Sequence, residues 1–179
     1  MQYNNTLIKR CFLGTYRYGH WVYFRVRTPI IRQVFLFLYL VLDLVFVRIF
    51  TGSHVPPECR IGRRLKIPHP SGIIIQKNVV IGDHVTILHQ VTIGINPMSA
   101  SDRKTAPRIG DHVYIGAGAK IIGAVRVGDH ARIGANAVVT RDIPAHCTAV
   151  GIPAKVIANN APSVNDGQAE GAESAGTGS

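Results

Sequence analysis

The chain has 179 residues, with 20 Lys and Arg against 10 Asp and Glu, a formal charge of +10 at pH 7. A chain of this length is expected to form one domain with additional segments outside it. The charge would suit nucleic acid, but no known nucleic-acid motif accompanies it, so we expect no nucleic-acid partner. The three cysteines are scattered and we see no secretory signal, so we expect free thiols and a cytoplasmic location.

Residues 1–52 form a basic, aromatic-rich segment. Pro29 suits the first turn of a helix, and residues 34–47 are apolar except for Asp43. As a helix, those residues would span about 21 Å, less than the ~30 Å hydrocarbon core of a bilayer, although a helix extended to residues 30–50 would just reach across it. We expect a helix that either packs on protein or lies in the membrane interface, with a full span least favoured.

After this segment the chain reads in sixes. IGDHVY, IGAGAK, IIGAVR, VGDHAR, IGANAV and VTRDIP (109–144) each open on Ile or Val. A six-residue period suits one short strand and one corner, so eighteen residues close one turn of a three-sided coil. The opening residue points inward and stacks on its counterparts in neighbouring turns.

This pattern predicts a mainly β fold with three regions. Residues 53–158 form a left-handed parallel β-helix of hexapeptide repeats. An N-terminal helical segment, 1–52, precedes the coil. Residues 159–179 are small and polar and should form a disordered tail.

The repeat is interrupted twice. Two extra residues enter near HPSG, 69–72, and the sixes stop again over 95–108. The second interruption is polar and contains prolines, so we expect it to leave the coil as a loop. Bulges and insertions in a solenoid often mark its functional face.

Two groups of histidines stand out. His84, His112 and His130 occupy equivalent positions in GDH motifs, which is typical of solvated corners. His69 lies in the first interruption, flanked by prolines, where a rigid bulge can project an imidazole for proton abstraction near neutral pH. His89 follows twenty residues later, so we expect it one turn above His69, either in the site or bonded to backbone.

Residues 61–157 resemble the serine O-acetyltransferase branch of the hexapeptide-repeat acyltransferases. The basic head resembles that of acetyltransferases of bacterial polysaccharide assembly. The resemblance rests on HPSGIIIQ (69–76), VTILHQVTIG (85–94), PRIGDHVYIGAGAKIIG (107–123), IGANAVVTRDIP (133–144) and GIPAKVI (151–157). It implies acetyl-CoA as the donor, a hydroxyl as the acceptor, and a homotrimer with active sites between neighbouring coils.

The resemblance also implies residue roles. His69 would be the general base, and we group His89 with it as a catalytic candidate. Lys155 would meet the nucleotide phosphates of acetyl-CoA. The pantetheine arm would lie along Gly116, Ala117, Ala135 and Asn136, and the acceptor would meet His54, Asp102 and Arg103.

Three departures from the serine enzymes favour a different acceptor. Those enzymes carry an aspartate at the position of His54, an acid at the position of Pro68, and a histidine in the loop that reads SDRKTAP (101–107) here. We therefore predict an O-acetyltransferase acting on a sugar hydroxyl, free or lipid-linked, in polysaccharide biosynthesis. We expect no metal. If the helix lies in the membrane interface, residues 1–50 would make peripheral contact with the inner membrane face.

Three alternatives stay open. One is a serine O-acetyltransferase. Another is a zinc-dependent hydratase of the carbonic anhydrase type, because His84 and His89 form an H-x4-H pair like the zinc ligands of that family. The last is a non-catalytic scaffold docked to a membrane.

Overall fold

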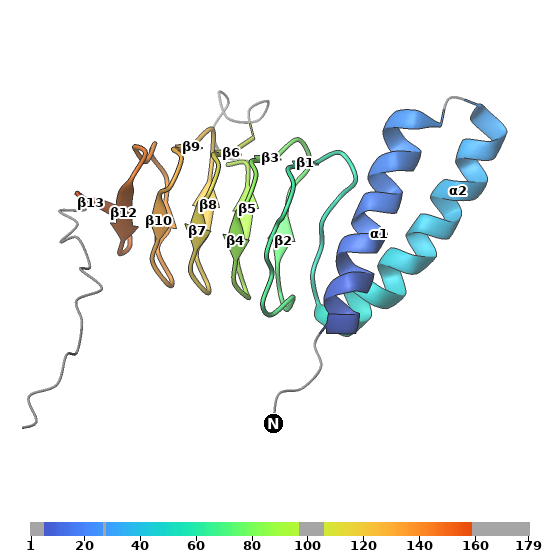
Figure 1. Ribbon diagram of the computed structural model, residues 1–179, viewed down its shortest axis with the longest axis horizontal. Coiled ribbons are helices and arrows are strands. Elements are labelled where there is room, and N and C mark those ends of the chain that lie inside the picture. Colours follow the sequence, from blue (N-terminus) through green and yellow to red (C-terminus); the bar gives the residue numbers. More distant parts are fainter. Residues whose placement is uncertain (1–5, 27, 97–105, 159–179) are drawn as a thin grey trace, which may run out of the picture.

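The computed structural model describes residues 6–26, 28–96 and 106–158 (Figure 1). Helix α1 (Thr6–Arg25) pairs with α2 (Pro29–Leu42), which continues directly into the π-helical segment η1 (Asp43–Ile49). The two helical rods lie at one end of a coil of short strands, with α2 outermost in the view (Figure 1). The predicted N-terminal helical segment is therefore present, and the chain enters the coil soon after it.

Helix α1 holds to the coil through one buried face. Phe12 and Tyr16 lie one helical turn apart, are 2% and 6% exposed, and belong to the same buried cluster as the interior of the coil. The Tyr16 hydroxyl donates a hydrogen bond of 2.8 Å to the carbonyl of Cys59, at the start of the coil. On the neighbouring face the ring of Tyr39 lies so close to Gly19 that no side chain would fit there.

The coil is built from two- to four-residue strands on three sides. The strands are β1 (Arg60–Ile61), β2 (Ile74–Ile75), β3 (Val80–Ile81), β4 (Thr86–Ile87), β5 (Thr92–Gly94), β6 (Arg108–Ile109), β7 (Tyr114–Ile115), β8 (Lys120–Ile122), β9 (Arg126–Val127), β10 (Arg132–Ile133), β11 (Val138–Val139), β12 (Cys147–Val150) and β13 (Lys155–Ala158). The sheet orders are β1-β3-β6-β9, β2-β5-β8-β11 and β4-β7-β10-β12-β13. Pairing is parallel except between β12 and the final strand, β13, which runs antiparallel.

The strand register confirms the six-residue period and both interruptions. In a regular turn partners lie 18 residues apart, as Ile75 does from Ile93. Across the first interruption they lie 20 apart, from β1 to β3, and across the second 28 apart, from β3 to β6. The first interruption therefore adds two residues and the second adds ten, without disturbing the coil above them.

The interior confirms the predicted stacking of aliphatic residues. Ile75, Ile93, Ile121 and Val139 come from successive turns and are all 0% exposed. A coil so narrow has room for Ile, Val and Ala but not for rings, which explains why the aromatic residues gather in the helices. These observations support a hexapeptide-repeat parallel β-helix, whereas its left-handed winding stays a prediction. The predicted disordered tail and residues 97–105 of the predicted loop lie outside the described residues.

The apolar helix begins at Pro29, where the sequence predicted its first turn. Helix α2 and η1 form a continuous stretch from Pro29 to Ile49, of 21 residues. At ~1.5 Å per residue it measures roughly 31 Å. By length and composition alone it could cross a bilayer, and only 17% of its most apolar window is buried. Packing within this chain therefore accounts for little of its apolar surface.

Candidate active site

The bulge that carries His69 is tied to the end of the apolar helix. The backbone N–H of Gly72 donates to the carbonyl of Thr51 at 2.8 Å. The N–H of Ile73 donates to the hydroxyl of Ser53, which is buried, at 3.0 Å. Gly72 has a φ of +64°, a conformation that glycine adopts without strain. The segment between helix and coil thus fixes the extra residues that bring His69 to the surface.

His69 meets His89 at this corner. Their ring centroids lie 6.2 Å apart with planes at 80°, an edge-to-face contact. His69 is exposed and His89 is half-buried. The carbonyl of His89 accepts a hydrogen bond of 3.0 Å from the N–H of Gly118 in the next turn. The two rings meet as predicted, although the residue at the equivalent position one turn below His89 is Ser71, whose carbonyl accepts from the N–H of Gln90. His69 reaches His89 from the bulge beside Ser71.

A cation that sequence reasoning did not single out lies beside this pair. The Lys120 ammonium donates to the carbonyl of Gln90, the neighbour of His89, at 2.6 Å. Lys120 occupies an outward position of β8, in register with Thr92 one turn below. The sequence feature that could have identified Lys120 as a site residue is its outward position in the otherwise apolar strand K-I-I. Its ammonium therefore places a positive charge at the backbone next to His89.

Above His89 the same corner is lined by small residues. The N–H of Asn136 donates to the carbonyl of Ala117, just as the N–H of Gly118 donates to that of His89. His89, Ala117 and Ala135 are therefore equivalent positions in successive turns. At Gly116 a Cβ would lie 2.6 Å from the backbone nitrogen of Ala135, so only glycine permits this approach. The predicted pantetheine residues thus form a continuous strip of the coil surface that begins at the histidine pair. We call this strip the lane, and it consists of Gly116, Ala117, Ala135 and Asn136.

Lys155 lies at the other end of the coil. It pairs with Val150 between the antiparallel strands β12 and β13, and its side chain is exposed. Figure 1 shows these strands at the opposite end from the helices. Lys155 thus lies at the end of the coil away from the helices, and its contact with the nucleotide phosphates stays a prediction.

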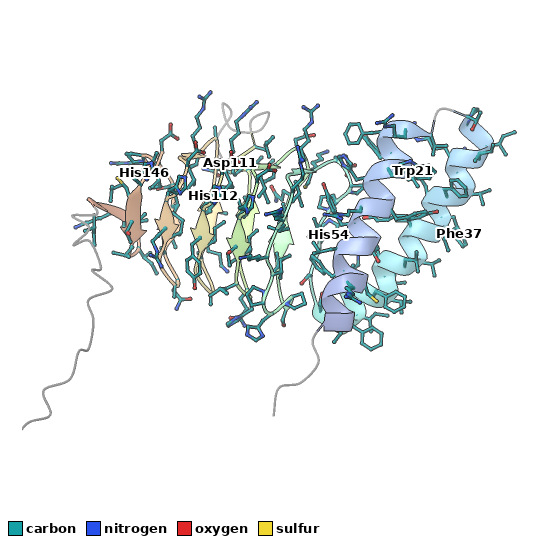
Figure 2. All side chains as sticks on the ribbon, in the orientation of Figure 1. Trp21, Phe37, His54, Asp111, His112 and His146 are labelled. Carbon is teal, nitrogen blue, oxygen red and sulfur yellow. The ribbon has the colours of Figure 1, made fainter. Side chains whose placement is uncertain are left out.

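His54 lines a different cavity. A pocket of about 790 Å³ lies between the helices and the coil, and its lining includes His54, Arg48, Ile95 and Ala106 but neither His69 nor His89. Figure 2 shows His54 at the helical end of the coil. Burial, and then the charge of Arg48, lower the pKa of His54. Its Nδ1 is buried without a hydrogen-bond partner among the described residues.

Of the three predicted acceptor residues, His54 is described, and it lines a pocket of its own away from the histidine pair. Asp102 and Arg103 lie outside the described residues. The flanks of their loop, Ile95 and Ala106, do line the pocket of His54. The roles assigned to these three residues stay predictions.

The GDH histidines form a stacked ladder at the preceding corner. The rings of His84, His112, His130 and His146 follow one another at centroid distances of 4.6, 4.7 and 4.8 Å, with nearly parallel planes. All four have φ between 57° and 60°, which is the left-handed corner conformation. His146 was not expected in this series because it lacks the GDH motif. Figure 2 shows His112 and His146 along one side of the coil.

The ladder separates the two histidines of the H-x4-H pair. His84 stacks on His112 at one corner, whereas His89 meets His69 at the next. Among the described residues no group of three or more His, Cys, Asp or Glu converges as metal ligands would. The geometry gives the zinc hydratase alternative no support.

Known proteins with similar sequences also contain hexapeptide repeats or are serine acetyltransferases. Residues 106–141 match the bacterial transferase hexapeptide (six repeats) model. The serine acetyltransferase of Mycobacterium tuberculosis is 39% identical over 118 residues, 66% of this chain and 51% of the relative. That of Synechococcus elongatus is 35% identical over 145 residues, 81% of this chain and 55% of the relative.

A solved structure extends the likeness to three dimensions. The serine acetyltransferase of Brucella abortus in complex with coenzyme A has a TM-score of 0.69 and 34% identity, over 82% of this chain and 54% of that one. The chain thus spans about half the length of the relatives it matches. From its register and interior the chain forms a coil of six-residue repeats, part of which matches the hexapeptide model, and the coil is similar in sequence and fold to these serine acetyltransferases.

Proposed function

We propose that this protein is an acetyl-CoA-dependent O-acetyltransferase in which His69 is the general base. The observation that carries the proposal is the edge-to-face pair of His69 and His89 at the start of a lane of small residues. An exposed imidazole beside a backbone lane can meet a thioester and an acceptor hydroxyl at the same point. Serine acetyltransferases similar to this chain, one solved with coenzyme A, support the same chemistry.

The reaction needs no covalent enzyme intermediate. His69 takes the proton of the acceptor hydroxyl as the hydroxyl oxygen attacks the thioester carbonyl carbon. A carbon–oxygen bond forms, and the carbonyl oxygen carries the negative charge until the carbon–sulfur bond breaks. The imidazolium of His69 then returns its proton to the departing sulfur, so that coenzyme A leaves as a thiol and His69 ends neutral.

The residues around the base assist in binding. His89 packs against the ring of His69 and limits its rotation, which keeps the base oriented. Gly116 and Ala135 let the pantetheine arm approach the backbone, whose N–H and C=O groups can bond its amides. Lys155 supplies a positive charge for the phosphates. Lys120, bonded to the carbonyl of Gln90 beside His89, is the candidate positive charge for the tetrahedral oxyanion.

Serine is the acceptor that the relatives favour, since those matched carry that name. The sugar acceptor expected from the sequence, and polysaccharide biosynthesis with it, gain no support from them. A sugar hydroxyl stays as the second candidate because His54 stands where the serine enzymes carry an aspartate, and faces a pocket of its own. The homotrimer also stays part of the proposal, with the neighbouring coil closing the exposed side of His69.

The test is release of coenzyme A thiol from acetyl-CoA, followed with a thiol-reactive dye. Serine, nucleotide sugars and a lipid-linked sugar serve as acceptors, and a reaction without acceptor corrects for protein thiols. We expect release that depends on serine. Stimulation by a sugar alone would establish the second candidate instead. If no acceptor stimulated thiol release and calorimetry showed no binding of coenzyme A, the proposal would be contradicted. That result would favour the non-catalytic scaffold docked to a membrane.

A further inference from the structure

The outer face of α2–η1 is an exposed apolar surface. Its 18-residue window has a mean hydropathy of 2.2, yet only 17% of that window is buried. The large side chains that it exposes recur at helical spacing and are Ile30, Ile31, Val34, Phe37, Leu38, Val41 and Leu44, with exposed fractions from 41% to 77%. Figure 2 shows Phe37 on the side of α2 away from the coil. We call this set the outer apolar face. So large a contiguous apolar patch marks an interaction surface.

The surroundings of this face are basic. Arg32 lies near the start of the apolar stretch and Arg48 near its end, and Arg10, Arg17 and Arg25 are exposed on α1. The single acid in residues 1–57 is Asp43, which is buried and bonded to Arg48 at 2.8 Å. The helical hairpin therefore offers an apolar face with positive charge around it and no exposed carboxylate.

This charge distribution selects the partner. A second copy of the hairpin would bring the same positive charges against one another, which costs free energy across an interface. Anionic lipid headgroups would instead neutralise them while the apolar side chains enter the acyl boundary. We propose that the outer apolar face docks on the surface of an anionic lipid bilayer.

The hairpin favours docking over a full span. Helix α1 packs along both α2 and η1, and it carries exposed Arg10 and Arg17. If α2–η1 crossed the bilayer, α1 would be drawn into the hydrocarbon with those charges, which is costly. With one face in the interface, the arginines stay among the headgroups and the long axis of the coil points away from the membrane (Figure 1).

Docking in this way would hold the histidine pair near the membrane. The bulge of His69 is hydrogen-bonded to Thr51, which follows the apolar helix. The proposal itself concerns lipid binding alone and does not depend on the acetyltransferase activity. It can fail or succeed whatever the acceptor proves to be.

The experiment is co-sedimentation of the full chain with two kinds of vesicle, one of phosphatidylcholine and one of phosphatidylcholine with an equal amount of phosphatidylglycerol. We expect binding to the anionic vesicles that weakens as salt is raised. The variant Phe37→Glu should lower the partition coefficient roughly tenfold to a hundredfold, since it removes a buried ring from the acyl boundary. Phe37 is 70% exposed, so the variant should fold normally.

A matched control comes from the other end of the coil. Ile152 is 74% exposed, and Ile152→Glu should bind vesicles as the unaltered chain does. Trp21, the only tryptophan, is 49% exposed on α1, and its emission should shift to shorter wavelength with anionic vesicles. No binding to anionic vesicles, or equal binding by Phe37→Glu, would overturn the proposal. So would a vesicle-independent oligomer that Phe37→Glu dissociates, since the face would then be an interface between copies.

Discussion

The ring of His69 meets the ring of His89 edge to face, with centroids 6.2 Å apart. The two residues come from successive turns, and the two-residue insertion before β2 brings them to one corner. The insertion is held by Gly72 bonding to Thr51, beyond the end of the apolar helix. The candidate base therefore depends on a contact between the helical segment and the coil as well as on its own turn.

Replacing His89 by alanine tests whether its ring orients the base. We expect kcat to fall about tenfold to a hundredfold, as small misplacements of a reacting group do, with KM for acetyl-CoA unchanged. Initial rates at varied acetyl-CoA would separate the effect on kcat from that on KM. An unaltered kcat would mean that His89 is only a structural coil residue.

Replacing Ala135 by phenylalanine tests the lane. Ala135 is exposed, so the ring would stand in the path of the pantetheine arm without disturbing the interior. We expect KM for acetyl-CoA to rise roughly tenfold or more, since a clash removes binding that the substrate and transition state share. Ala145→Phe is the matched control, because Ala145 is also exposed but lies next to the histidine ladder. Equal KM values for the two variants would argue against the lane.

The lowered pKa of His54 predicts a pH dependence of stability. Burial and the charge of Arg48 keep His54 neutral in the fold at pH values where the unfolded chain, with a pKa near 6.5, binds a proton. This contribution is fully present above that pKa, and the free energy of unfolding falls as pH drops below it. Urea unfolding of the chain and of His54→Gln at about pH 7.5 and about pH 5.5 would measure it. Parallel losses in both proteins would contradict it.

The buried thiol of Cys59 predicts selective labelling. Cys59 is 0% exposed, and burial raises the pKa of its thiol to about 12. Cys11 and Cys147 are partly exposed. A thiol-reactive dye should therefore label at most these two in the native protein, and all three only in denaturant. Rapid labelling of Cys59 without denaturant would mean that the first turn of the coil opens readily.

The sequence was sufficient for the coil because its period is local. Each six contains its own strand and corner, so the interruptions at 69–72 and 95–108 could be located by counting. Helix α1 was harder to predict, since its buried residues include Gly19, whose role is to admit the ring of Tyr39. That contact exists only once the helices pair.

The site was predictable only in part for a similar reason. His69 and His89 could be paired because they differ by one turn and the insertion. Lys120 was missed because its partner, the Gln90 carbonyl, is an ordinary backbone group until β8 passes over it. The pocket of His54 needs both the helices and the coil, so no stretch of sequence reveals it.

The most direct test of the account is acetyl transfer by His69→Ala, with His112→Ala as the matched control. Both histidines are exposed, but His112 stands in the ladder at another corner. The account predicts that His69→Ala folds, binds coenzyme A as before and transfers acetyl groups about 10²–10⁴-fold more slowly, the range for loss of a positioned base. His112→Ala should retain the original rate. If His69→Ala also retained it, His69 would not be the base.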